Sequence, residues 1–113
     1  MTSRSKYHAL PTVVDGIRFA SRAEARRYRE LTLLARAGTI DTLELQPRYV
    51  LSASPTPAPD RVKVGEYRAD FRYRVAATGA LVVEDVKGMD TPLSAWKRKH
   101  TGIQYDLTVE IVR

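Results

Sequence analysis

The segment 81–86 constrains the fold of this chain more than any other part of its sequence. Four of its six residues, Leu-Val-Val-Glu-Asp-Val, are apolar, and a nearly continuous apolar run of this length is typical of a strand buried on both faces. Such a strand needs a covering layer on each side, and 113 residues suffice for one modest core of that kind. The sequence therefore predicts a single α/β domain.

Capping signals predict two helices. Ser21 with Glu24 forms a capping box at the start of the first helix, and Gly38 is a typical residue just past a helix end. Thr91, followed by a proline whose missing N–H is tolerated at the first helical position, begins the second. We expect Gly102 to close it.

Turn signals and alternating apolar residues predict the strands. The expected elements, in chain order, are a hairpin over 12–19, a helix over 22–37, strands over 43–52, 64–75 and 81–86, a helix over 92–101 and a strand over 105–112. This is an αβββαβ order, with a mixed sheet flanked by helices and preceded by a β-hairpin. We expect residues 1–9 to form a basic arm, residues 10–113 a single domain, and residues 52–63 a mobile proline-rich loop.

Charge and composition narrow the class of partner. Lys and Arg number 19 against 13 Asp and Glu, which favours a polyanion such as a nucleic acid. The chain has no cysteine, which excludes disulfide scaffolds, cysteine zinc sites and thiol catalysis. No apolar run is long enough to span a bilayer, and the basic N-terminus leads into no apolar signal region. We therefore expect a soluble protein of the cytoplasm.

Two acidic positions stand out because strands disfavour them. Asp70 interrupts a predicted strand on a face otherwise made of arginines, where it either pairs with Arg68 or Arg72 or serves a site. Asp85 and Lys87 end the apolar strand; by strand alternation they share one face, and Glu84 points to the other. Burying charge is costly unless it is paired or bound to a metal. An Asp–Lys pair at a frayed strand end, with Glu84 in solvent, is the alternative.

Together these residues form the pattern Asp-x14-Asp-x-Lys. Two convergent carboxylates suit Mg²⁺, which binds oxygen ligands, and Mn²⁺ can substitute for it. An ammonium group beside a bound metal orients the attacking water and stabilises the charge that develops on phosphorus. Asp70, Asp85 and Lys87 are therefore the predicted centre of a phosphodiester-cleaving site.

Other residues are candidates for supporting roles. Glu24 has two possible roles. It either caps its own helix, or it lies on the face of that helix that is directed at the sheet and serves as a third metal ligand. Gln46 either lines the site or is a buried, satisfied amide, and Glu84 is a second candidate acid beside Asp85. The basic residues expected to meet the DNA backbone are Lys97, Lys99, Arg68 and Arg72.

The motifs 5–9 (SKYHA), 15–24 (DGIxFxSxxE), 45–47 (LQP), 67–73 (YxADFxY) and 83–88 (VEDVKG) resemble a family of small phage and prophage proteins of the PD-(D/E)XK nuclease superfamily. The resemblance covers essentially the whole chain and implies a restriction-endonuclease-like αβββαβ core. It also implies a Mg²⁺-dependent endonuclease, similar to Holliday-junction resolvases, acting on branched DNA inside a bacterial host.

By the same resemblance, Asp70, Asp85 and Glu24 would bind metal and Lys87 would assist the water. Many nucleases of this size act as homodimers, although the sequence shows no dimer surface. Two alternatives remain open, a DNA-binding module without catalysis and a phage structural or interaction protein.

Overall fold

A computed structural model describes residues 11–57 and 60–113 of the chain. The basic arm expected over residues 1–9 lies outside the described residues. Two helices and eight strands form within them, in the order β1-β2-α1-β3-β4-β5-β6-β7-α2-β8. The α/β class expected from the sequence is confirmed.

The central sheet has four strands in the order β3-β6-β7-β8, namely β3 (Ile40–Leu45), β6 (Phe71–Val75), β7 (Leu81–Val86) and β8 (Val109–Val112). β3, β6 and β7 pair antiparallel, whereas β7 and β8 pair parallel through the crossover helix α2 (Pro92–Tyr105). The sheet is therefore mixed, as expected. Its strands and the two helices follow one another in the order α1-β3-β6-β7-α2-β8.

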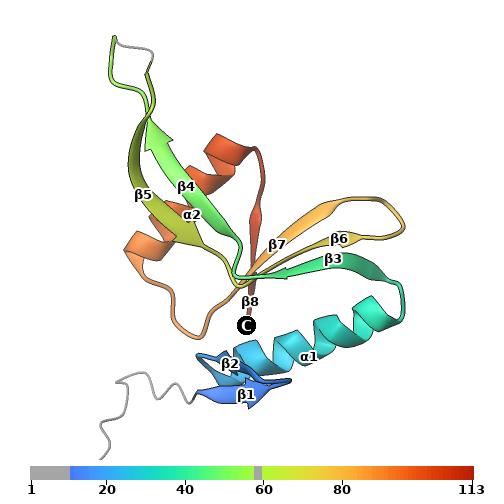
Figure 1. The fold of residues 1–113 in the computed structure, drawn as a ribbon. Coiled ribbons are helices and arrows are strands. Elements are labelled where there is room, and N and C mark those ends of the chain that lie inside the picture. Colours follow the sequence, from blue (N-terminus) through green and yellow to red (C-terminus); the bar gives the residue numbers. More distant parts are fainter. Residues whose placement is uncertain (1–10, 58–59) are drawn as a thin grey trace, which may run out of the picture.

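Two of the expected strands each divide into two. Residues 43–52 belong to β3 and β4 (Arg48–Ala53), and residues 64–75 to β5 (Val62–Arg68) and β6. The chain bends at Gln46, which has φ 50°, and at residues 69–70, so that β4 and β5 form a separate antiparallel pair. Figure 1 shows this pair leaving the central sheet on the side away from α1. The expected loop over 52–63 is shorter, since Ser52 and Ala53 still pair with Lys63 and Val62.

The first helix forms where its capping signals predict. In α1 (Arg22–Arg36) the Ser21 side chain accepts a hydrogen bond of 3.1 Å from the Glu24 N–H. At the other end, Gly38 has φ 78° and its N–H bonds to Ala35 O, while the Thr39 N–H bonds to Leu34 O. These two bonds form a Schellman motif, which requires the left-handed backbone that glycine adopts without strain.

The second helix is longer than expected. Thr91 caps it and proline takes its first position, as predicted, but the helix continues through Gly102 to Tyr105 and ends at Asp106, which has φ 53°. The prediction that Gly102 closes the helix is therefore wrong. A Cβ at this position would lie 2.7 Å from Leu107 O, so Gly102 permits a close approach of the backbone. Because of the extra turn, β8 begins only at Val109.

The core consists of two clusters on opposite faces of the sheet. One lies between α1 and the sheet and includes Phe19, Ala25, Leu31, Ile40, Phe71, Tyr73 and Val86. The other lies between the sheet and the β4–β5 pair and includes Tyr49, Leu51, Tyr67, Ala69 and Val83. β7 contributes to both, as expected for a strand buried on two faces.

The hairpin β1 (Thr12–Val14) and β2 (Ile17–Phe19) precedes α1. Its turn residues Asp15 and Gly16 both have positive φ, which is the tight turn that Asp-Gly predicts. Within the described part of the chain, no helix is long and apolar enough to cross a membrane.

Candidate active site

Asp70 lies at the bend between β5 and β6 rather than in the middle of a strand, which corrects the sequence-based placement. Backbone bonds tie this bend to its neighbours: the Asp70 N–H donates to Glu84 O (3.0 Å), and the Gln46 N–H donates to Asp70 O (2.9 Å). The side chain turns toward the end of β7, where Oδ2 accepts a 2.7 Å hydrogen bond from the Val86 N–H. The expected alternative, a pair with Arg68 or Arg72, does not form.

Asp85 lies beside it on the face of β7 that also carries Val83. Its carboxyl is 4% exposed, accepts a hydrogen bond from the Tyr67 hydroxyl, and lies 3.5 Å from the Lys87 ammonium. The Lys87 N–H bonds to Val112 O, so the residue continues the pairing of β7 with β8. The prediction that Asp85 and Lys87 share a face is confirmed.

Glu84 points to the opposite face, as predicted, but it is buried rather than solvated. Its carboxylate forms a two-point ion pair with Arg27 of α1, through Nε (2.8 Å) and Nη2 (2.7 Å), and accepts a hydrogen bond from the Tyr73 hydroxyl. A charge that is 1% exposed persists there because all of these donors converge on it. Glu84 therefore ties the first helix to the sheet, and its carboxylate does not face the Asp70 side of the strand.

Glu24 reaches the acidic cluster from the first turn of α1. A cleft of about 180 Å³ is lined by Glu24, Gln46 and Asp70, together with residues of β2 and β3. Gln46, whose backbone lies in the bend between β3 and β4, is exposed at this cleft rather than buried. Of the two readings the sequence left open, the structure therefore favours Gln46 as a lining residue.

The acidic cluster is electrostatically strained. Burial raises the pKa of Asp70 from 3.8 to about 8, helped by the Asp85 carboxyl as a hydrogen-bonding partner and by the charge of Glu24. The Val86 N–H acts in the opposite direction. Burial also raises the pKa of Glu24, and the negative charge of Asp85 adds to it. Carboxyl groups held together in this way repel one another unless a proton or a cation lies between them.

This arrangement fits a divalent cation in part. Asp70 and Asp85 supply neighbouring carboxyl oxygens, and Mg²⁺ commonly takes one or two protein carboxylates and completes its shell with water and phosphate oxygens. Among residues 11–57 and 60–113, no group of three or more His, Asp or Glu side chains is close enough to hold an ion by itself. Glu24 shares the cleft with Asp70 but does not complete such a group.

The four basic candidates have different surroundings. Arg72 is engaged by Glu44 and by the Tyr49 hydroxyl (2.9 Å), so its guanidinium is held within the protein. Arg68 is exposed on β5, Lys99 is exposed on α2, and Lys97 is partly buried on the same helix. DNA contact by these residues stays a prediction.

Two residues of this region were missed by sequence reasoning. Arg27 lies near the inward stripe of α1 with Tyr28 and Leu31, and a basic residue at that position was a sign of a buried acidic partner. Tyr67 lies on the inward stripe of β5, and burial together with its bond to Asp85 raises its pKa. No local signal paired it with a residue eighteen positions away.

Fold and site together define a small α/β domain that carries an acidic pair and a lysine beside the ends of β6 and β7, the two inner strands of its mixed sheet. The chain belongs to the family described as "Protein of unknown function (DUF1064)", whose model matches residues 4–112. No curated protein and no solved structure matches the chain significantly.

Proposed function

We propose that this protein is a metal-dependent DNA endonuclease of the PD-(D/E)XK type, built on a restriction-endonuclease-like core. The observation that carries the proposal is that Asp70, at the bend between β5 and β6, lies against Asp85 near the end of β7, with the Lys87 ammonium 3.5 Å from the Asp85 carboxyl. The order of the central-sheet elements, α1-β3-β6-β7-α2-β8, agrees with the αβββαβ order of that superfamily.

Each residue of the cluster has a role in this chemistry. Asp70 and Asp85 would hold Mg²⁺, or Mn²⁺ in its place, and Glu24 would contribute from the cleft through water or substrate. The bound ion would supply Lewis acidity, activating a water and offsetting charge on the phosphate. The Lys87 ammonium, held beside Asp85, would orient that water and stabilise the charge of the transition state.

Burial strengthens these roles. Asp85 is 4% exposed, and the Tyr67 hydroxyl fixes its carboxyl, so the group needs little reorganisation to act as a ligand. The Val86 N–H fixes Asp70 in the same way. Two acids held rigidly side by side, at a cost in mutual repulsion, are more readily explained by a ligand than by stability alone.

A DNA-binding module without catalysis is the second candidate. The observation that favours it is that no group of three acidic or histidine ligands forms among the described residues. Both candidates explain the excess of basic residues, 19 against 13 acidic.

The deciding experiment incubates the purified protein with linear duplex, single-stranded and four-way-junction DNA, each with Mg²⁺, Mn²⁺ or EDTA. We expect metal-dependent cutting, with branched DNA as the preferred substrate in keeping with a role in phage replication or recombination. Lys87→Ala should abolish cutting while DNA binding persists. Lys63→Ala, which removes an exposed lysine paired with Glu66, is the matched control and should cut normally. If no substrate is cut with either metal, the proposed nuclease activity is refuted.

A further inference from the structure

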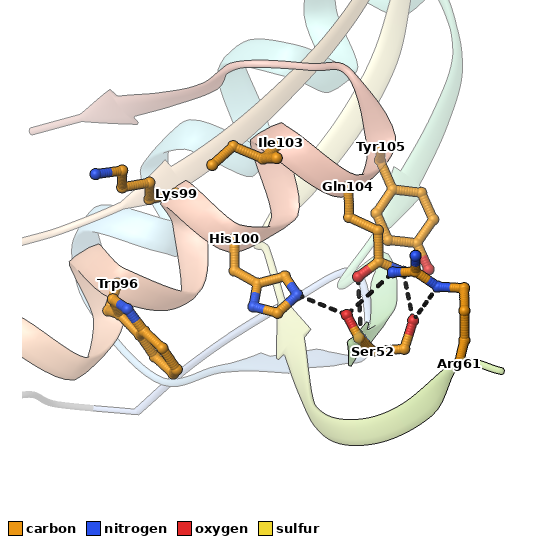
Figure 2. Close-up of a pocket in the computed structure, with 8 residues that line it drawn as sticks. All are labelled: Ser52, Arg61, Trp96, Lys99, His100, Ile103, Gln104 and Tyr105. Carbon is orange, nitrogen blue, oxygen red and sulfur yellow. Dashed lines mark hydrogen bonds between the residues drawn. The ribbon is translucent and has the colours of Figure 1, made fainter. Parts of the chain in front are cut away.

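A second and larger cleft lies between α2 and the β4–β5 pair. It has a volume of about 770 Å³ and shares no lining residue with the cleft at Glu24 and Asp70. Figure 2 shows Trp96, Lys99, His100 and Ile103 along the helix on one side, and Arg61 with Ser52 on the other. We call it the α2 groove.

Hydrogen bonds through Ser52 hold the two walls of the α2 groove together. The Ser52 N–H donates to the Gln104 side chain (3.0 Å), and His100 Nε2 lies 3.0 Å from Ser52 O. Arg61 donates from Nε to Ser52 Oγ (2.8 Å) and from Nη2 to Ser52 O (3.0 Å). The groove is therefore preorganised, and a ligand need not order these side chains when it binds.

The lining combines an open aromatic surface with positive charge. Trp96 is 61% exposed and Ile103 76%, and the Trp96 and His100 rings form a T-shaped contact with a centroid distance of 6.1 Å. Lys99 is exposed and forms no ion pair or hydrogen bond with the part of the chain that the structure describes. Arg61 adds a second cation, and none of the described residues that line the groove is acidic.

A large exposed indole in a groove that also holds cations without an acidic partner among the described residues suits single-stranded nucleic acid, because bases stack on the ring while the cations meet phosphates. A base within a duplex presents no free face for such stacking. A second copy of this chain is a poorer occupant, since it would bring a chain with 19 basic residues against a basic groove.

We propose that the α2 groove binds an unpaired DNA strand, with a base stacked on Trp96 and backbone phosphates at Lys99 and Arg61. The inference rests on the proposed function and extends it, because it makes the substrate a DNA that carries a single-stranded segment. Flapped, forked or partly melted DNA has such a segment, whereas a plain duplex or a fully paired four-way junction does not.

The chain offers its own probe, since Trp96 is its only tryptophan. We would titrate the 113-residue chain in EDTA with an oligothymidylate and follow tryptophan emission, so that binding is measured without cutting. Emission should be quenched to saturation, and raising the salt concentration should weaken the binding. A fully paired duplex of equal length should quench far less.

DNA binding by variants of the groove residues is measured by the fluorescence anisotropy of a labelled oligothymidylate. Trp96→Ala should weaken binding about tenfold, in line with the loss of one stacked base, and Trp96→Phe should restore part of it. Lys99→Ala should weaken binding and reduce its salt dependence by about one phosphate contact. Leu33→Ala and Arg36→Ala, at exposed positions of α1, are the matched controls and should bind as the unchanged protein does.

The outcomes separate this inference from the proposed function. If DNA quenches the emission and the groove variants bind it more weakly, the proposed single-strand site is supported even if no substrate is ever cut. Lys87→Ala should then bind normally. Unchanged emission at saturating DNA, or full affinity in both groove variants, overturns the groove even if the protein cuts DNA. Emission that changes with protein concentration alone identifies a second copy as the occupant and also overturns it.

Discussion

Asp70→Asn should stabilise the metal-free protein at alkaline pH, which is an unusual expectation for a residue of a candidate active site. The folded protein raises the pKa of this carboxyl from 3.8 to about 8, through burial first and then through the Asp85 carboxyl and the charge of Glu24. The stability that this group contributes is therefore fully present below pH 3.8 and is lost as the pH rises to about 8. An asparagine is neutral throughout and avoids that loss.

The full shift, from 3.8 to about 8, sets an upper limit of roughly 6 kcal/mol. Water reaches the partly exposed carboxyl at the cleft and screens its charge, so we expect a gain of about 2 kcal/mol at pH 8. For a chain of this size that gain raises the midpoint of thermal unfolding by about 8 °C. At pH 4 the gain should be small, because the aspartic acid is then neutral in the folded protein and only partly ionised in the unfolded chain.

The assay is thermal or urea unfolding in EDTA at pH 4, 6 and 8, followed by circular dichroism. Asp60→Asn, at an exposed position of the loop that leads into β5, is the matched control and should change nothing at any pH. An Asp70→Asn variant that is less stable than the unchanged protein at pH 8, or equally stabilised at all three pH values, would refute the reasoning.

Three further outcomes are expected. Arg27→Ala leaves Glu84 buried without its cation and should lower the free energy of unfolding by about 3 kcal/mol, measured by urea denaturation; a loss below half of that would contradict a structural ion pair. Gly102→Ala places a Cβ 2.7 Å from Leu107 O and should cost about 2 kcal/mol in the same assay, whereas Gly65→Ala, with nothing within 4 Å, should cost far less. Mg²⁺ should raise the unfolding midpoint of the unchanged protein more at pH 8 than at pH 5, because protons compete for the same carboxyls. At a Mg²⁺ concentration of a hundred times its Kd, the free energy of unfolding should rise by about 2.7 kcal/mol. Equal shifts of the midpoint at both pH values would contradict carboxylate binding.

The features that the sequence predicted well are those fixed by neighbouring residues. Ser21 with Glu24 and the Asp15-Gly16 turn each act within four residues, so their patterns determine the local backbone whatever the rest of the chain does. The opposite orientations of Glu84 and Asp85 followed from strand alternation in the same way.

The bends could not be predicted because the alternating pattern continues through them. Ala69, Phe71 and Tyr73 form one inward stripe in the sequence, yet Ala69 belongs to the cluster under the β4–β5 pair and the two aromatic residues to the cluster under α1. Periodicity reports which side chains are buried, not against which layer they pack. The partners Arg27 and Tyr67 were missed for a related reason, since each meets its carboxylate across a long stretch of chain.

The bend that carries Asp70 connects the acidic pair to the β4–β5 pair. Asp70 belongs to a connection of two residues between that pair and the central sheet, and the Ala69 N–H donates to Pro47 O on the neighbouring connection. Asp85 lies within β7, which is held by pairing on both sides. The Asp70 N–H donates to Glu84 O and its carboxyl accepts from the Val86 N–H, so these bonds also tie the bend to β7. Because the β4–β5 pair also forms a wall of the α2 groove, one structural element joins that groove to the bend that carries Asp70.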